Sequence, residues 1–273
     1  MKNNEKLKLL EEKARELRKT VLTMIYEAKS GHPGGSLSAA DIVTALYYDE
    51  LYIDPTNPGL PERDRVILSK GHSCPVIYSV LAMKGYFDYE IIHTLRKMGS
   101  ILQGHPDMKK VPGIDMTTGS LGQGLSAGVG MAIGLKSDHL KSRVYVILGD
   151  GEIQEGQVWE ALMLASKYKL DNIVAILDNN NLQIDGTCEE IMPIEPIDKK
   201  FEAFGWDVLS IDGHDMEQIL NAFYRARLIR DRPVCIIART VKGKGISFME
   251  NQCDWHGTAP NPSQYEEIGR AHV

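Results

Sequence analysis

The chain has 273 residues and a formal net charge of −6, which is enough for one complete hydrophobic core and too acidic for a typical nucleic-acid-binding protein. No apolar run approaches the ~20 residues needed to cross a bilayer, and the charged amino terminus does not resemble a signal peptide. Its four cysteines lie far apart, without a C-x-x-C pair. We therefore expect reduced thiols in a cytoplasmic protein that binds neither nucleic acid nor membrane.

Hydrophobic periodicity predicts helices and strands that alternate along a single domain, residues 1–273. An amphipathic helix is expected over 5–29, and a polar, glycine-rich loop segment over 240–273. The motif Ser38-Ala-Ala-Asp41 is a predicted capping box that begins a second helix. Further helices are expected at 75–84, after the glycine-rich motif 117–124, at 157–169 and at 215–230. Strands are expected at 66–68, 144–148, 173–177, 206–211 and 233–238.

The segment 143–186 is the most informative part of the chain. Two short apolar runs, 144–148 and 173–177, flank the helix at 157–169. This is the pattern of a right-handed βαβ unit whose two strands are buried in a parallel sheet. We therefore expect a doubly wound α/β fold, with a mainly parallel sheet of about five strands flanked by helices.

Polar residues follow both strands of this unit, at what should be the same edge of the sheet. Asp150 and Asn180 each fall just past a strand end, and neighbouring strands lie only ~4.8 Å apart. Together with the carbonyl of Leu182 they form a hard oxygen set that suits Mg²⁺ or Ca²⁺ rather than zinc. Gly151 lets the backbone approach a phosphate at the start of a helix. The pattern indicates a diphosphate bridged to the protein through a metal.

Two other interpretations of this glycine-rich turn are weaker. A dinucleotide-binding fingerprint would continue Gly149-x-Gly151 with a third glycine at position 154, which is Gln154. An ordinary α/β turn would explain the Gly-Asp-Gly sequence alone. It would not explain the asparagine run that follows the next strand.

Four of the eight histidines lie next to glycine or proline in irregular segments. They are His32, His72, His105 and His256. Imidazole can bind sugar hydroxyls and phosphate and can transfer protons near neutral pH, so their similar contexts favour one shared site. Glycines at 128, 130 and 134 indicate close packing of a helix against a cofactor, another subunit or a neighbouring helix. We assign His214, in a strand-to-helix loop, a structural role.

The motifs around these residues resemble those of the transketolase family. GDGxxxEG at 149–156 and DNNxLxIDG at 178–186 resemble its thiamine diphosphate motif. SGHPG, SKGH, GHP, TTGxLGQG and HGxAP also stand in family order along the chain. The chain departs from many members at Asn181, where they have glycine, and at Ser120, where they have proline.

The resemblance implies a role for each motif residue. The implied metal ligands are Asp150, Asn180 and the carbonyl of Leu182. The implied contacts to thiamine diphosphate are His72, Gly119, Ser120, Leu121, Gly151, Glu155, Asn180 and His256. The implied catalytic residues, which face the sugar and the thiazolium, are His32, His105 and His256. Glu155 also matches an acidic residue that the family places at its subunit interface.

The resemblance further implies that the chain is the amino-terminal subunit of a split transketolase, because it covers only the first domain of the full-length enzymes. Such an enzyme transfers a two-carbon ketol unit from a ketose or ketose phosphate to an aldose, using thiamine diphosphate and Mg²⁺, with Ca²⁺ or Mn²⁺ as substitutes. The expected partner is a separate carboxyl-terminal subunit that binds the pyrimidine ring, in a 2+2 assembly, within carbohydrate metabolism such as the pentose phosphate pathway. The alternatives are a subunit of another carboligase, such as a deoxyxylulose-phosphate synthase-like or sugar-specific enzyme, and a non-catalytic cofactor-binding subunit.

Overall fold

The computed structural model describes residues 3–271 and contains one five-stranded sheet, in the order β1-β2-β3-β5-β4, whose neighbouring strands are all parallel. The strands are β1 (Arg65–Leu68), β2 (Val144–Gly149), β3 (Ile173–Asn179), β4 (Asp207–Asp212) and β5 (Val234–Arg239). The expected parallel α/β fold is confirmed, and each strand lies within two residues of its predicted position.

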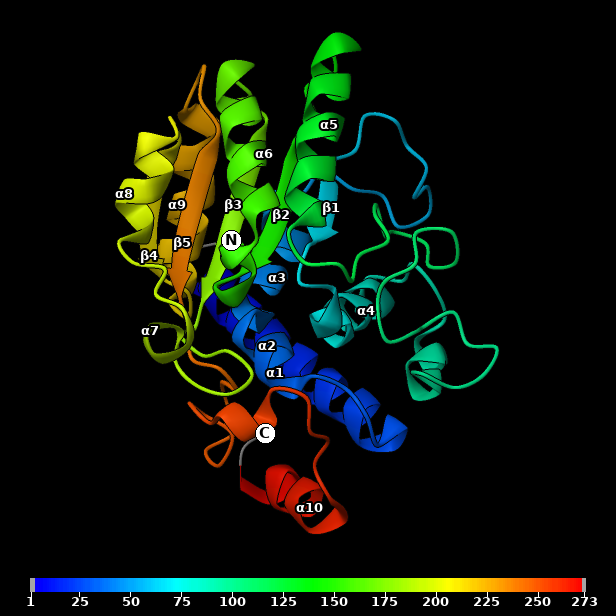
Figure 1. Cartoon of the computed structure of the whole chain (residues 1–273). Coiled ribbons are helices and arrows are strands. Elements are labelled where there is room, and N and C mark those ends of the chain that lie inside the picture. The colour runs from blue at the N-terminus through cyan, green and yellow to red at the C-terminus, as the bar shows by residue number, and fades with distance from the viewer. Residues whose placement is uncertain (1–2, 272–273) are drawn as a thin grey trace.

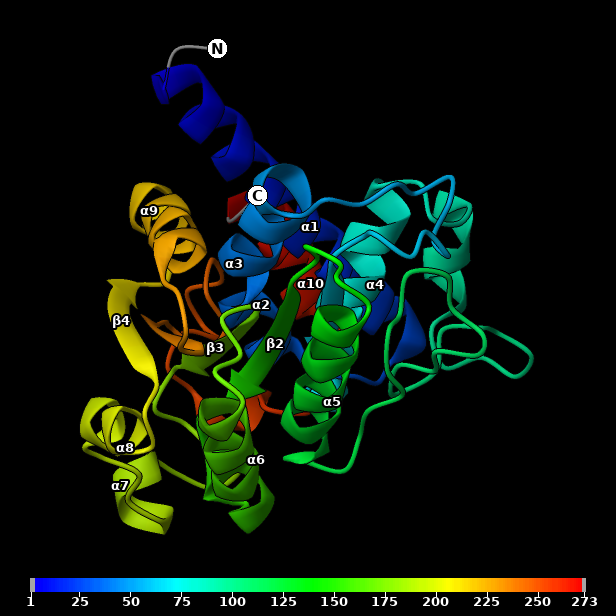
Figure 2. The same cartoon turned by 90° about the horizontal axis from the view of Figure 1, so that it is seen from above.

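Helices cover both faces of the sheet, as Figures 1 and 2 show. One face packs against α1 (Asn3–Ala28), α3 (Ala40–Ala45), α4 (Cys74–Met83) and α9 (Met216–Leu228). The other packs against α5 (Gln123–Ser137), α6 (Gly156–Lys167) and α8 (Ile197–Ala203). The helices α2 (Pro33–Ser38), α7 (Cys188–Ile191) and α10 (Pro262–Ala271) lie toward the carboxyl edge of the sheet (Figure 1). Short 3₁₀ or π-helical segments occupy 46–50, 71–73, 89–94, 151–154 and 253–255.

The central strands are apolar on both faces, which is why the sheet separates two hydrophobic cores. In β2, Tyr145 and Ile147 belong to the core under α1 and α4, whereas Val146 and Leu148 belong to the core under α5 and α6. Successive side chains of a strand point to opposite faces. A continuous apolar run is therefore what a strand between two helical layers requires.

Of the three glycines singled out in α5, Gly128, Gly130 and Gly134, only the first is explained by packing within the domain. A Cβ at Gly128 would lie 2.6 Å from Val146 Cγ2, so the helix lies directly on β2 there. Gly130 and Gly134 would meet no atom within 4 Å. These two glycines lie on the exposed side of the helix.

Two local predictions were wrong. Ser38 is the last residue of α2 and caps nothing, because its hydroxyl donates to Asp178 Oδ2 at 2.5 Å and to the carbonyl of Gly35 at 3.2 Å. The segment 240–273 is not only loop, since α10 packs its partly buried Tyr265 against Tyr26 of α1, with ring centroids 3.9 Å apart. Residues 272–273 lie outside the described part of the chain.

No helix within residues 3–271 combines the length and apolar character that crossing a membrane would require. Cys74, Cys188, Cys235 and Cys253 all carry free thiols.

Candidate active site

A cavity of about 370 Å³ opens at the carboxyl edge of the sheet, beyond the ends of β1, β2 and β3. It brings together most of the residues singled out in the sequence. Those lining it are His32, His72, Gly119, Leu121, Asp150, Gly151, Glu155, Asn180, Leu182 and His256. The carboxyl edge is where ligands bind in open α/β sheets.

Asp150 ties the ends of β2 and β3 together at the floor of this cavity. The strands pair in register up to Gly149 and Asp178, so Asp150 and Asn180 follow adjacent strand ends. Asp150 Oδ1 accepts the N–H of Gly151 at 2.8 Å, and Oδ2 accepts the N–H of Asn181 at 2.5 Å. The sequence prediction that these two positions converge is consistent with this geometry.

The electrostatics at this point suit a bound cation. Burial, and then repulsion by Asp178, raise the pKa of Asp150 to about 6. The ammonium of Lys242 lies 3.1 Å from the carbonyl oxygen of Leu182 and 3.2 Å from that of Gln183. The ammonium of Lys242 thus already contacts the predicted ligand carbonyl of Leu182, and the carboxylate of Asp150 has no ion pair among residues 3–271.

The donor atoms available here also select the kind of metal. A carboxylate, an amide oxygen and a backbone carbonyl are hard oxygen ligands, which suit Mg²⁺ with phosphate oxygens and water completing its shell. Residues 3–271 contain no cluster of three histidine, cysteine, aspartate or glutamate side chains that could hold a metal. The residues present therefore fit the implied magnesium-bridged diphosphate and do not fit a zinc-type centre.

Three of the four predicted histidines form a triangle on the wall of the cavity. The ring centroids are 5.2 Å apart for His32 and His72, 5.4 Å for His32 and His256, and 5.2 Å for His72 and His256. Burial is the main cause that lowers the pKa of His32 and of His256 to about 4, and that of His72 to about 2. All three rings are therefore neutral near pH 7 and can each donate and accept a hydrogen bond.

Lys242 fixes the tautomer of one of these rings. Its ammonium donates to His256 Nδ1 at 2.9 Å, which leaves the proton of the neutral ring on Nε2. His32 Nδ1 is buried without a hydrogen-bond partner among residues 3–271. Both rings thus keep polar atoms for a ligand.

Two predicted residues do not line the cavity. His105 is exposed and stands next to it, where a Cβ on Gly119 would lie 3.3 Å from His105 Cδ2. Burial, and then the charge of Arg96, lower the pKa of His105. Ser120 is exposed and has no side-chain hydrogen bond among the residues described.

The structure adds functional candidates that sequence reasoning missed. Lys242 is the clearest, and Lys70 also lines the cavity, where its ammonium pairs with Asp178. Burial alone would raise the pKa of Asp178, but Lys70 and the hydroxyls of Ser38 and Thr240 hold it below its ordinary value. Asp178 follows the predicted strand at 173–177 and Lys70 follows the one at 66–68, so the rule that used strand ends to find Asp150 could have found this pair.

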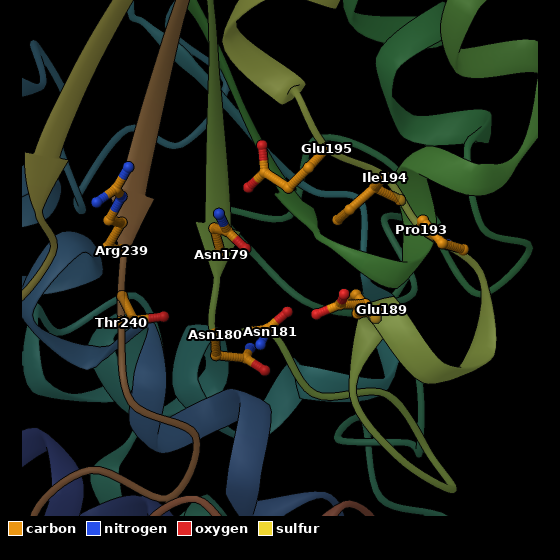
Figure 3. Close-up of a pocket in the computed structure, with 10 residues that line it drawn as sticks. Asn179, Asn180, Asn181, Glu189, Pro193, Ile194, Glu195, Arg239 and Thr240 are labelled. Carbon is orange, nitrogen blue, oxygen red and sulfur yellow. The ribbon is translucent and has the colours of Figure 1, made fainter.

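A second cavity, of about 570 Å³, lies beyond the ends of β3 and β5, and Figure 3 shows residues that line it. Asn179 and Arg239 come from the ends of β3 and β5, and Glu189 and Glu195 come from the segment that follows β3. This cavity shares Asn180 with the first one and contains none of the predicted histidines. Its two carboxylates outnumber its single cationic side chain, Arg239, which makes it a poorer place for a diphosphate.

The fold and the cavity define an α/β domain built to hold a phosphorylated cofactor at the carboxyl ends of parallel strands. The family model of the transketolase thiamine diphosphate-binding domain matches residues 10–271. The chain belongs to the transketolase family, and it is a subunit of a thiamine diphosphate-dependent transketolase, a transferase. The expectation drawn from the motifs is confirmed.

Individual relatives show how much of such an enzyme the chain represents. It is 48% identical to the 6-deoxy-6-sulfo-D-fructose transketolase subunit of Clostridium sp. (strain MSTE9), over 97% of this chain and 94% of that subunit. It is 46% identical to an apulose-4-phosphate transketolase subunit of Phocaeicola vulgatus, over 96% and 92%. The solved transketolase of Campylobacter jejuni superposes with a TM-score of 0.90 at 36% identity, over 96% of this chain but only 43% of that one.

Proposed function

We propose that the 370 Å³ cavity holds thiamine diphosphate through Mg²⁺, and that the complete active site forms only when a second subunit covers it. The observation that carries this proposal is the convergence of Asp150, Asn180 and the carbonyl of Leu182 beneath the neutral histidine triangle. These three residues are the proposed ligands of Mg²⁺, for which Ca²⁺ or Mn²⁺ could substitute.

The walls of the cavity have separate proposed roles. Gly151 lines the cavity and carries no side chain, so a diphosphate can approach its backbone closely. The other proposed contacts to the cofactor are His72, Gly119, Ser120, Leu121, Glu155, Asn180 and His256. Thiamine diphosphate, when bound, supplies the reactive carbon and the electron sink for breaking the bond beside a ketose carbonyl.

The proposed catalytic residues are His32, His105 and His256. A neutral imidazole in a partly buried position can take a proton from a sugar hydroxyl or return one, and can orient the hydroxyl by a hydrogen bond. His32 Nδ1 and His256 Nε2 are the atoms left for this by the surrounding contacts. His105 lies at the outer rim, where an incoming sugar would pass.

The proposed reaction moves a two-carbon ketol unit from a ketose to an aldose. Relatives that act on a sulfosugar and on apulose 4-phosphate favour sugars that carry an anionic group, in a branch of carbohydrate metabolism that need not be the pentose phosphate pathway. Their description as subunits supports a partner that supplies the carboxyl-terminal half, and we propose a 2+2 heterotetramer by symmetry. We propose a cytoplasmic location on the basis of the free thiols.

Thermal unfolding of the purified chain tests the proposal. Thiamine diphosphate with Mg²⁺ should raise the unfolding temperature, most strongly once a co-purifying partner is added, because a ligand at ~100 times its Kd stabilises by about 2.7 kcal/mol. The pair, but not the chain alone, should transfer the two-carbon unit. A shift with a nicotinamide dinucleotide and none with thiamine diphosphate would overturn the proposal. Cofactor binding by the pair without any transfer would leave only a binding subunit.

A further inference from the structure

A separate cavity of about 280 Å³ lies between α1 and the loop that follows β5. Its lining includes four cationic side chains, Arg15, Arg18, Lys19 and Lys244, and two carboxylates, Glu11 and Asp41. None of them lines the cofactor cavity. Four cations against two carboxylates leave this lining with an excess of positive charge, on a protein whose net charge is −6.

Carboxylates compensate only part of this charge. Arg18 forms a bidentate pair with Asp41, at 3.0 and 2.6 Å, and Lys244 lies 3.5 Å from Glu250. Arg15 and Lys19 have no ion pair among residues 3–271. Two cationic groups at the mouth of the cavity thus remain available to an anion.

The deepest cation, Arg18, lacks one hydrogen-bond acceptor. Its side chain is 13% exposed, and its Nε is buried without a partner among residues 3–271. The loop closes on it because Gly245, at φ +96°, brings its backbone so close that a Cβ would lie 3.2 Å from Arg18 Cδ. Native proteins pair nearly all buried polar groups, and an oxyanion bound beside the guanidinium of Arg18 would supply the missing acceptor.

We propose that this cavity is a second anion site, which binds a phosphate group presented as inorganic phosphate or as a small sugar phosphate. Several guanidinium and ammonium donors around one space suit an oxyanion with three or more acceptor oxygens. Arg15 and Lys19 contribute charge at the rim. Arg18 Nε contributes the inner hydrogen bond.

A bonded path connects this site to the cofactor cavity. Asp41 Oδ2 accepts from His214 Nδ1 at 2.7 Å, and His214 Nε2 accepts the N–H of Val241 at 2.8 Å. The next residue is Lys242, whose ammonium contacts Leu182 and His256. An anion that rearranges Arg18 and Asp41 therefore acts on the loop that holds Lys242. This coupling, unlike the anion site itself, rests on the proposed function.

Equilibrium dialysis of the full chain with radiolabelled phosphate tests the site, at constant ionic strength and with thiamine diphosphate and Mg²⁺ in excess to fill the cofactor cavity. We expect one saturable phosphate site. The double variant Arg15→Gln/Lys19→Gln should weaken it about tenfold or more, since it removes two charge-assisted contacts. Competition by glucose 6-phosphate distinguishes the sources: stronger competition than by unlabelled phosphate indicates a sugar phosphate, and weaker competition indicates the free ion.

The matched control is Lys8→Gln/Lys141→Gln, which removes two exposed charges outside the cavity. Unchanged phosphate binding in the first variant, equal losses in both, or no saturable site in the parent chain would each overturn the proposal. The difference between the two variants does not depend on cofactor binding, so a failure of the proposed function would be recognised separately. If phosphate binds but leaves the Kd for thiamine diphosphate unchanged, the coupling through His214 is wrong.

Discussion

The two edges of the parallel sheet both bury charge, but they compensate it differently. At the amino edge, Asp115 accepts both Nη atoms of Arg63, at 2.5 and 3.1 Å. Glu50 accepts the hydroxyl of Tyr145 at 2.7 Å and pairs with Arg227 at 2.9 Å. Every oxygen of these two carboxylates is thus occupied by another part of the same chain.

At the carboxyl edge the compensation is incomplete. Asp150 has backbone N–H partners but no ion pair among residues 3–271. The buried atoms His32 Nδ1 and Gln183 Nε2, on residues that line the cofactor cavity, have no hydrogen-bond partner there. Because native proteins pair nearly all buried polar groups, unpaired ones that converge on a cavity mark a ligand site, whereas the fully paired charges at the amino edge mark a structural one.

The largest effect should come from a substitution at the amino edge of the sheet, and it should be a loss of stability. Asp115→Ala leaves Arg63 without its carboxylate and the N–H of Val66 without its acceptor, which lies at 2.8 Å. We expect the free energy of unfolding in urea to fall by about 3–5 kcal/mol. The affinity of the folded fraction for thiamine diphosphate should not change. A variant of parental stability would show that the amino edge does not depend on this pair.

Asp150→Asn should instead weaken cofactor binding and have little effect on stability. Without the negative ligand, affinity for thiamine diphosphate in the presence of Mg²⁺ should fall about 100-fold, or about 2.7 kcal/mol. The cofactor-free protein should lose little stability, since the removal of repulsion between Asp150 and Asp178 offsets the loss of one of the two oxygens that accept a backbone N–H. Isothermal titration calorimetry of the chain together with its partner measures the affinity. If Asp150→Asn binds the cofactor like the parent chain, the metal assignment is wrong.

The fold and the floor of the site could be predicted because they depend on local pattern and chain direction. Buried parallel strands are continuous apolar runs, and such runs locate β1, β2, β3 and β5, whereas the edge strand β4 is only partly apolar. The residues just past two such runs must then meet at one edge, which places Asp150 beside Asn180 on the strength of the sequence pattern. For the strands and for the residues that follow them, the local sequence pattern is therefore enough to predict where they lie in the sheet.

Contacts that depend on the path of the chain were missed. Lys242 lies 60 residues from Leu182, and Lys70 lies 108 residues from Asp178. Lys70 and Asp178 follow predicted strands, so the rule that located Asp150 could have paired them. The contact of Lys242 instead depends on how the irregular segment after β5 folds back over the cavity, which no periodicity encodes. Ser38 was misinterpreted for the same reason, since a serine before a helical pattern indicates a cap, and only the tertiary structure shows its hydroxyl directed at Asp178.

The smallest effect should be a dependence of stability on pH that originates at the carboxyl edge. Burial lowers the pKa of His72 to about 2, whereas a histidine in an unfolded chain titrates near 6.5. Below about pH 6.5 the imidazole of His72 therefore binds a proton in the unfolded chain but not in the native state. The free energy of unfolding should therefore decrease as the pH is lowered, by up to about 1.4 kcal/mol per pH unit for His72. His32 and His256 should contribute less, because they are more exposed to solvent.

His72→Asn should make this slope shallower between about pH 6 and pH 5, measured by urea unfolding of the cofactor-free chain. The control is His139→Asn, because His139 is exposed, lies outside the cavity and has φ +57°, a conformation that asparagine tolerates. Equal slopes in the parent and in His72→Asn would mean that His72 is protonated in the native state, and a neutral histidine triangle would then be wrong. A shallower slope in His72→Asn but not in His139→Asn would show that His72 stays neutral in the native state. The carboxyl edge would then bury a neutral histidine, whereas the amino edge buries charges that are paired.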